Sequence, residues 1–281
     1  MKFLVHHEVY NQQVMIKKEL LSALGFFIAI YAIICWHLYM SQEGMIFFPQ
    51  KLNKSYKFNF DQNFDEIKVK MKDGITIDGI LFKANNSRGL VFYLHGNAGS
   101  IDVWGKVAKT YNDLNYDVFL LDYRGYGKSD GQINGERGLF EDIQTAYDEM
   151  KKRYSEDKIV VLGYSIGTGL AAKLASINKP HLLILQAPYY SLTDLMAKSY
   201  PIIPTFILKY KFETNIYIKK CKMPVVIFHG DKDEVIYYES SLRLKESFKK
   251  YDRLIILNGQ KHNDMTENKD YKKEIQRILN P

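Results

Sequence analysis

Six short apolar runs constrain the fold of this chain more than any other feature. They show no apolar–polar alternation and lie at residues 89–94, 117–121, 158–162, 182–186, 224–229 and 253–257. Strands with continuous apolar sequence are buried on both faces, as parallel strands are. Helical patterns follow several of these runs, at residues 136–154, 241–251 and 271–279. Strands that alternate with helices predict an α/β fold, with a mostly parallel central sheet and helices on both of its faces.

A hairpin is predicted just before the first of these runs. Within residues 66–82, Ile67, Val69 and Met71 alternate with polar residues, and a turn at Asp73-Gly74 separates this arm from a second apolar one. This pattern is typical of two antiparallel strands with one solvated face. We therefore expect the globular domain to span residues 61–281.

The N-terminal region contains an apolar segment long enough to cross a membrane. Residues 20–40 include no Asp, Glu, Lys or Arg, and a helix of that length spans roughly 30 Å, the thickness of the hydrocarbon core of a bilayer. A cleaved signal peptide would have a shorter apolar core and small residues at a cleavage site, which are missing here. A buried helix is the other alternative. We predict a single uncleaved membrane span after an N-terminal segment (residues 1–19) and before a linker (residues 41–60).

The charges beside this span bear on its orientation. Lys17 and Lys18 precede the span and Glu43 follows it, which favours a cytoplasmic N-terminus and an extracytoplasmic domain. Three lysines of the linker weaken this bias because they lie on the other side. They are Lys51, Lys54 and Lys57.

Composition and motifs exclude several functional classes. The net charge of +7 comes from lysines spread throughout the chain without a dense basic arm, so we expect no nucleic-acid partner. Two cysteines, one of them inside the apolar segment, do not make a disulfide framework. The sequence "GYGKS" lacks the first glycine of a phosphate-binding loop, "GYSIGTG" does not match the dinucleotide fingerprint, and no zinc-ligand spacing occurs. We therefore expect neither a cofactor nor a metal. The sequence does not indicate an oligomeric state.

Polar, glycine-rich loops follow five of the six apolar runs, and ligands in open α/β sheets bind beyond these strand ends. In the loop after residues 158–162, Ser165 has a glycine two positions before it and another two positions after it, which fits a nucleophile at a sharp strand-to-helix turn. A serine hydrolase also needs a base and an acid, and in this class of fold the chain order is Ser, acid, His. Asp233 and His262 follow in that order, although spacing alone does not separate Asp233 from Asp231 or Glu234. The N–H groups of Ile166 and of the "HGNAG" loop, from Asn97, are candidate oxyanion donors.

Five motifs in collinear order resemble the α/β-hydrolase superfamily, in particular its membrane-anchored ABHD-type serine hydrolases. They are "FYLHGNAGS", "LLDYRGYGKSDG", "VVLGYSIGTG", "VIFHGDKDEVI" and "GQKHNDM", and the resemblance runs from about residue 65 to the C-terminus. It implies Ser165 as nucleophile, Asp233 as acid and His262 as base, with Asn97 and Ile166 as oxyanion donors. His95 and His229 are expected to bond loop backbone, Tyr164 to pack beneath the turn, and Asp122, Arg124 and Asp130 to brace their loop.

The insertion at residues 187–223 is predicted to be a short cap over the site. It is rich in Tyr, Phe, Ile and Pro and carries several lysines, which suits a hydrophobic acyl group. The alternative is that these aromatic residues only cover the sheet. We expect cleavage of an ester or thioester of a small-molecule or lipid-like substrate. A peptidase or amidase of the same fold and a non-catalytic membrane-tethered scaffold remain alternatives.

Overall fold

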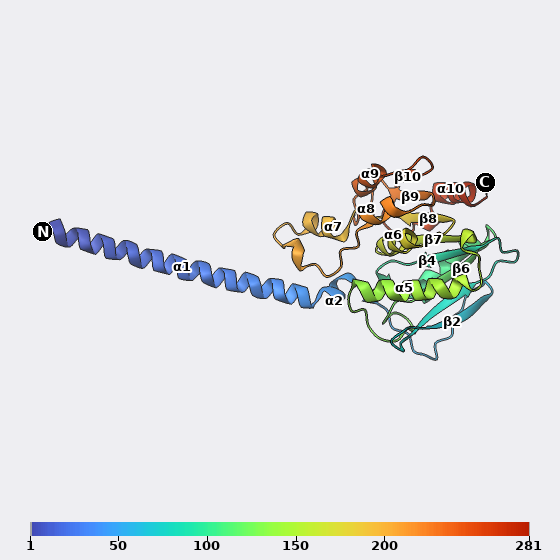
Figure 1. Ribbon diagram of the computed structural model, residues 1–281, viewed down its shortest axis with the longest axis horizontal. Coiled ribbons are helices and arrows are strands. Elements are labelled where there is room, and N and C mark those ends of the chain that lie inside the picture. Colours follow the sequence, from blue (N-terminus) through green and yellow to red (C-terminus); the bar gives the residue numbers. More distant parts are fainter. Residues whose placement is uncertain (1, 281) are drawn as a thin grey trace. The chain divides into compact units, whose positions relative to one another are not determined.

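The computed structural model describes residues 2–280. The chain divides into two compact units, one ending at Gln42 and one beginning at Glu43 (Figure 1). The second unit contains all of the strands.

The first unit is a single long helix, α1 (Lys2–Met40). By length and composition, its portion Asn11–Met40 could cross a membrane. Large apolar side chains such as Phe26, Phe27 and Ile33 are exposed along it. The predicted apolar segment therefore lies within a longer helix that also includes most of the polar residues before it. A short helix, α2 (Gln42–Ile46), follows.

The second unit is organised around an eight-stranded sheet. Its strands are β2 (Phe64–Lys70), β3 (Thr76–Phe82), β4 (Leu90–Leu94), β6 (Asp117–Leu121), β7 (Ile159–Tyr164), β8 (Leu182–Gln186), β9 (Val225–Gly230) and β10 (Arg253–Leu257). Their order across the sheet is β10-β9-β8-β7-β4-β6-β3-β2. The pairs from β10 to β6 are parallel, and β3 pairs antiparallel with both β6 and β2. All six apolar runs are strands and the hairpin is present, so the predicted α/β architecture is confirmed.

Helices cover both faces of this sheet. Successive residues of each strand face opposite sides, so every strand contributes side chains to both layers. In β4, Leu90, Phe92 and Leu94 pack in one apolar cluster, which includes residues of α5 (Glu136–Lys151) and α6 (Gly167–Ile177). Val91 and Tyr93 pack in the other cluster, with residues of α4 (Ala108–Asn112) and α10 (Lys269–Leu279). The five strands from β9 to β6 are thus buried on both faces, which explains their continuous apolar sequence.

One predicted helix is shorter than its pattern. The pattern at residues 241–251 continues beyond the end of α9 (Glu239–Lys245). The carboxylate of Asp252 accepts hydrogen bonds from the N–H groups of Lys249 (2.8 Å) and Val225 (2.9 Å). These bonds form a turn and join it to the start of β9, so the chain leaves the helix before it enters β10.

The strand order places a change of direction at β4. The chain goes from β4 to its neighbour β6 on one side, and then crosses back to β7 on the other side. The loops after β4 and β7 therefore diverge at one edge of the sheet, which is where open α/β sheets form their binding crevices. In the loop after β4, β5 (Ala98–Gly99) forms a small parallel pair with β1 (Phe48–Pro49), which precedes the sheet in the chain. The insertion contains α7 (Leu192–Ser199) and α8 (Thr214–Tyr217).

Candidate active site

Ser165 lies on a sharp turn between β7 and α6. Its backbone has a φ of 52°, in the left-handed region, which costs a non-glycine residue about 1–2 kcal/mol. The flanking glycines make the turn possible because the backbones approach closely. A Cβ at Gly163 would lie 2.4 Å from the carbonyl oxygen of Gly167, and one at Gly167 would lie 2.2 Å from that of Leu94. The turn is therefore packed directly against the end of β4, as a nucleophile elbow requires.

Ser165, His262 and Asp233 form one hydrogen-bonded chain, although 97 residues separate the first two in the sequence. The Oγ of Ser165 lies 3.0 Å from Nε2 of His262, and Nδ1 of His262 lies 2.7 Å from Oδ2 of Asp233. Because a carboxylate only accepts, Nδ1 carries the proton and Nε2 is free to accept from the serine hydroxyl. Ser165 and His262 are each only 8% exposed, so this chain is largely shielded from water.

The carboxylate of Asp233 is fixed by four groups. Its Oδ1 accepts hydrogen bonds from the N–H groups of Val235 (2.9 Å) and Ile236 (2.8 Å), while its Oδ2 also lies 3.3 Å from Nε2 of His229. Burial alone would raise the pKa of Asp233, but the bonds from His229, His262 and Ile236 lower it well below its ordinary value. Asp233 therefore remains ionised across the physiological pH range.

His229 has a larger part in this arrangement than the sequence indicated. It is fully buried at the end of β9, with Nε2 2.8 Å from the carbonyl oxygen of Ile236 and Nδ1 2.6 Å from Oγ of Ser241. The predicted backbone bond is present, and the contact with Asp233 is additional. Its position four residues before Asp233 was the available sequence signal, but only the turn between them brings the side chains together.

Tyr164 connects the turn at Ser165 to His262. Its hydroxyl donates a hydrogen bond to the backbone carbonyl of His262, and its ring packs 5.3 Å from that of Trp104 between centroids. The residue before the serine therefore fixes the backbone of the histidine, in addition to the predicted packing beneath the turn.

Several backbone carbonyl groups of the loop after β4 accept hydrogen bonds from aromatic side chains. Tyr123 donates its hydroxyl proton to the carbonyl of His95 (2.9 Å), Tyr126 donates to that of Asn97 (2.7 Å), and Nε1 of Trp104 donates to that of Ala98 (2.8 Å). His95 itself is fully buried, and burial lowers its pKa to about 4, so it is neutral. Its Nδ1 lies 2.7 Å from the carbonyl oxygen of Gly96 and donates to it.

These bonds orient the N–H group of Asn97. The peptide between Gly96 and Asn97 is planar and trans, so its N–H points opposite to the Gly96 carbonyl that His95 binds. In the part of the chain that the structure describes, the N–H groups of Asn97 and Ile166 donate to no acceptor. Two unpaired donors thus come from the loops after β4 and β7, which pack together at Gly167.

The segment expected to be a linker packs against this loop. The N–H of Phe48 donates to the carbonyl of Asn97 (2.8 Å), and the Asn97 amide donates to the carbonyl of Ile46 (3.2 Å). Phe47 is only 4% exposed, whereas Met45 and Phe48 are about half exposed. The compact domain therefore includes residues well before 61.

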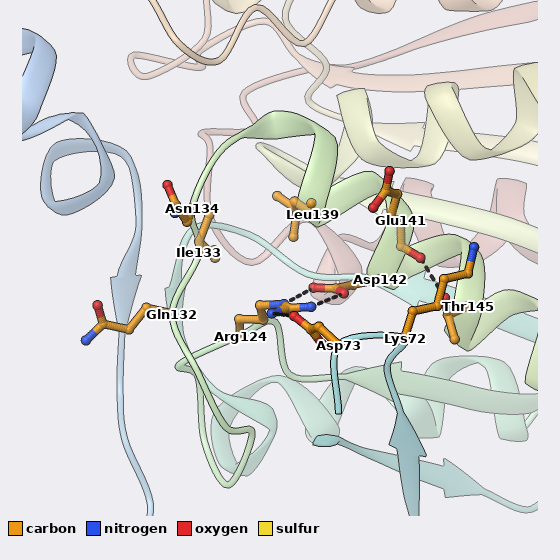
Figure 2. Close-up of a pocket in the computed structure, with 11 residues that line it drawn as sticks. Lys72, Asp73, Arg124, Gln132, Ile133, Asn134, Leu139, Glu141, Asp142 and Thr145 are labelled. Atoms are coloured by element: carbon orange, nitrogen blue, oxygen red, sulfur yellow. Dashed lines mark hydrogen bonds and ion pairs between the residues drawn. The ribbon is translucent and has the colours of Figure 1, made fainter. Parts of the chain in front are cut away.

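A separate polar cavity of about 260 Å³ lies between the β2–β3 turn, the loop after β6 and α5 (Figure 2). Arg124 bonds both oxygens of Asp142 and reaches Asp73, 2.6 Å away, so its charge is already neutralised there. The expected bracing role of Arg124 thus involves α5 and the hairpin turn. No residue of the Ser165 site lines this cavity. Among the described residues, no group of three or more His, Cys, Asp or Glu side chains is arranged to bind a metal ion.

Comparison with known proteins identifies a matching family profile and a related fungal protein. A family profile described as "Serine aminopeptidase, S33" matches residues 85–219. Protein bem46 of Schizosaccharomyces pombe is 32% identical over 226 residues, which cover 74% of this chain and 75% of that protein.

Two solved structures are similar to this one at low sequence identity, and the first is described as that of an esterase. Pf2001 of Pyrococcus furiosus has a TM-score of 0.67 at 18% identity, covering 83% of this chain and 97% of that one. Est1E of Butyrivibrio proteoclasticus, solved with ferulic acid bound, has a TM-score of 0.61 at 20% identity, covering 76% and 97%. These similarities confirm the α/β-hydrolase fold predicted from the sequence.

Proposed function

Because the chain belongs to the α/β-hydrolase superfamily as a bem46-like member, we propose that it is a membrane-anchored serine hydrolase that cleaves carboxylic esters or thioesters. The single observation that carries this proposal is the hydrogen-bonded chain from Ser165 through His262 to Asp233, because it supplies an activated nucleophile. In the proposed reaction Ser165 is the nucleophile, His262 the general base and Asp233 the acid that orients it.

The reaction proceeds in two halves. Nε2 of His262 takes the hydroxyl proton as Oγ of Ser165 attacks the acyl carbonyl, and the imidazolium that forms is stabilised by the ionised Asp233. The tetrahedral intermediate collapses when His262 returns the proton to the leaving alcohol or thiol, which leaves an acyl-enzyme. A water molecule then repeats the sequence, releases the carboxylic acid and restores the serine.

The negative charge of the tetrahedral intermediate requires donors that are already in place. The N–H groups of Asn97 and Ile166 fill this role in our proposal, since both are unpaired in the described chain and lie on adjoining loops. The loop bonds from His95, Tyr123, Tyr126 and Trp104 keep the Asn97 peptide in its orientation.

The proposed substrate is acylated or lipid-like. Helix α1 is long and apolar enough to serve as a single-span anchor, with the hydrolase domain on the extracytoplasmic side. An anchored hydrolase reaches substrates that are dissolved in the bilayer. The matching profile is named for an aminopeptidase and one structurally similar protein is described as an esterase, so the proposed ester cleavage is tested against amide cleavage below.

The test is covalent labelling of the full-length, detergent-solubilised protein with a fluorophosphonate probe. We expect Ser165→Ala to abolish labelling, while Ser176→Ala, on the helix that follows the turn, keeps it. A series of p-nitrophenyl esters and the matching amides then separates an esterase from an amidase. A folded parent protein that does not react with the probe would favour a tethered scaffold and contradict the proposal.

A further inference from the structure

The tip of the cap presents apolar side chains to solvent. This segment, residues 200–208, follows α7 and is hereafter called the cap tip. Tyr200 is 60% exposed, Ile202 79% and Phe206 85%. In contrast, Tyr189, Tyr210 and Phe212 at the two ends of the insertion are buried. The aromatic residues of the insertion therefore divide into a set that covers the sheet and a set that does not.

The cap tip is held firmly at both ends. Before it, the Asp194 carboxylate of α7 binds Arg243 (2.7 Å) and the hydroxyl of Tyr237 (2.6 Å). After it, the N–H of Lys211 donates to the carboxylate of Glu136 (2.6 Å). The exposed side chains thus sit on a segment whose two ends are fixed to the domain by charged and polar contacts.

Basic residues flank this apolar segment. Residues 195–211 include Lys198, Lys209 and Lys211 but no Asp or Glu. Among the described residues, Lys198 and Lys211 form no ion pair, although Nζ of Lys198 lies over the ring of Tyr237, 3.7 Å from its centroid. An apolar centre between lysines matches a surface with acyl chains below and anionic groups above, which is the boundary region of a bilayer.

The chain from the apolar helix enters the hydrolase domain beside this segment. Glu43, the first residue of the domain unit, accepts hydrogen bonds from the hydroxyl of Tyr210 (2.9 Å) and from Nζ of Lys209 (3.2 Å). The ring of Phe47 packs edge-to-face on Tyr210, with centroids 5.2 Å apart. Only six residues separate Met40, the end of α1, from the buried Phe47. The connection between the apolar helix and this part of the domain is therefore short.

We propose that the cap tip inserts into the surface of the bilayer that holds α1, with Tyr200, Ile202 and Phe206 at the level of the acyl chains and with Lys198 and Lys211 against anionic headgroups. This inference rests on the proposed membrane anchor and deepens the proposed function. The entering chain also braces the loop of Asn97, so the cap tip and the Ser165 site lie near the same point of entry. Acyl substrates would then reach Ser165 directly from the lipid phase.

The test uses the full-length protein in lipid nanodiscs of phosphatidylcholine, with or without phosphatidylglycerol. A bimane fluorophore is attached at Phe206→Cys, and nitroxide-labelled lipid serves as quencher. The matched control is Tyr251→Cys, an exposed aromatic residue (69%) that also has lysines nearby in the sequence but lies on the turn before β10. The unsubstituted chain, labelled in parallel, gives the background from Cys35 and Cys221.

Insertion predicts that nitroxide lipid quenches the probe at position 206 at least about twofold more than the probe at 251, and that phosphatidylglycerol increases the difference. Equal quenching at the two positions would overturn the proposal. So would a probe at 206 that is shielded only when two copies occupy one nanodisc, because the occupant would then be a second chain.

Fluorophosphonate labelling of the same samples separates this proposal from the enzymatic one. Labelled protein without quenching refutes membrane insertion alone. Quenching without labelling supports insertion and refutes the hydrolase.

Discussion

Replacing Asp233 by Asn tests the proposed mechanism at its most specific point. The two backbone N–H groups of Val235 and Ile236 bind Oδ1, so they will hold the amide oxygen at that position. The NH₂ group must then replace Oδ2, 2.7 Å from Nδ1 of His262. Because the amide donates there, His262 will carry its proton on Nε2 and can no longer accept the proton of Ser165.

The size of the effect follows from this change of tautomer. In Ser-His-Asp enzymes the wrong tautomer lowers kcat by about 10⁴-fold, which corresponds to about 5.5 kcal/mol of transition-state stabilisation. The fold should survive, since the amide is isosteric and keeps both backbone bonds. The lost contact between His229 and the carboxylate should cost about 1–3 kcal/mol of stability.

The assay is steady-state hydrolysis of p-nitrophenyl butyrate, with the rate of fluorophosphonate labelling as a second readout and a thermal melt as the folding control. Asp231→Asn and Glu234→Gln are the matched controls, because both acids are near in sequence and neither touches His262 in the described structure. We expect both controls to retain most of their activity. An Asp233→Asn protein that is folded and keeps a tenth or more of the parental kcat would refute the reasoning.

Two further predictions concern stability and reactivity. Gly167→Ala would place a Cβ 2.2 Å from the carbonyl oxygen of Leu94, so we expect a loss of several kcal/mol in unfolding free energy or a failure to label Ser165. Gly138→Ala, in open space on α5, should instead raise stability by about 0.5–1 kcal/mol; urea titration of both variants checks the pair, and equal stabilities would contradict it. Burial raises the pKa of Cys221 to about 12, so iodoacetamide at pH 8 should modify it only after unfolding, as peptide mapping would show. Because the unfolded thiol ionises near pH 8.5, its contribution to stability should decline as pH rises from there towards 12; modification of the native protein at pH 8 would contradict this assignment.

The fold and the chain order of the candidate residues followed from local patterns. Runs such as 89–94 and 182–186 predict buried parallel strands because both faces of those strands must be apolar. The glycines around Ser165 predict the turn because only a hydrogen fits beside the neighbouring backbone. Both are properties of a few consecutive residues, so they can be read from the sequence.

Other features depend on residues that are distant in the sequence. Spacing could not distinguish Asp233 from Asp231 and Glu234, whereas the hydrogen bonds of the folded loop place Asp233 alone against His262. The contact of Tyr164 with the backbone of His262 spans 98 residues. No local pattern records such a contact, because a hydrogen bond needs only one donor and one acceptor.

The insertion at 187–223 shows the division most clearly. By itself, the sequence determined that this segment is apolar, aromatic and basic, and it left open whether these side chains cover the sheet or serve another surface. The tertiary structure decided that Tyr210 and Phe212 are buried while Tyr200 and Phe206 face solvent. The residue types are alike in both groups, and burial depends on whether another part of the chain is close enough to exclude water. The entering segment at Glu43 and Phe47 provides such a neighbour for Tyr210, and Phe140 of α5 provides one for Phe212.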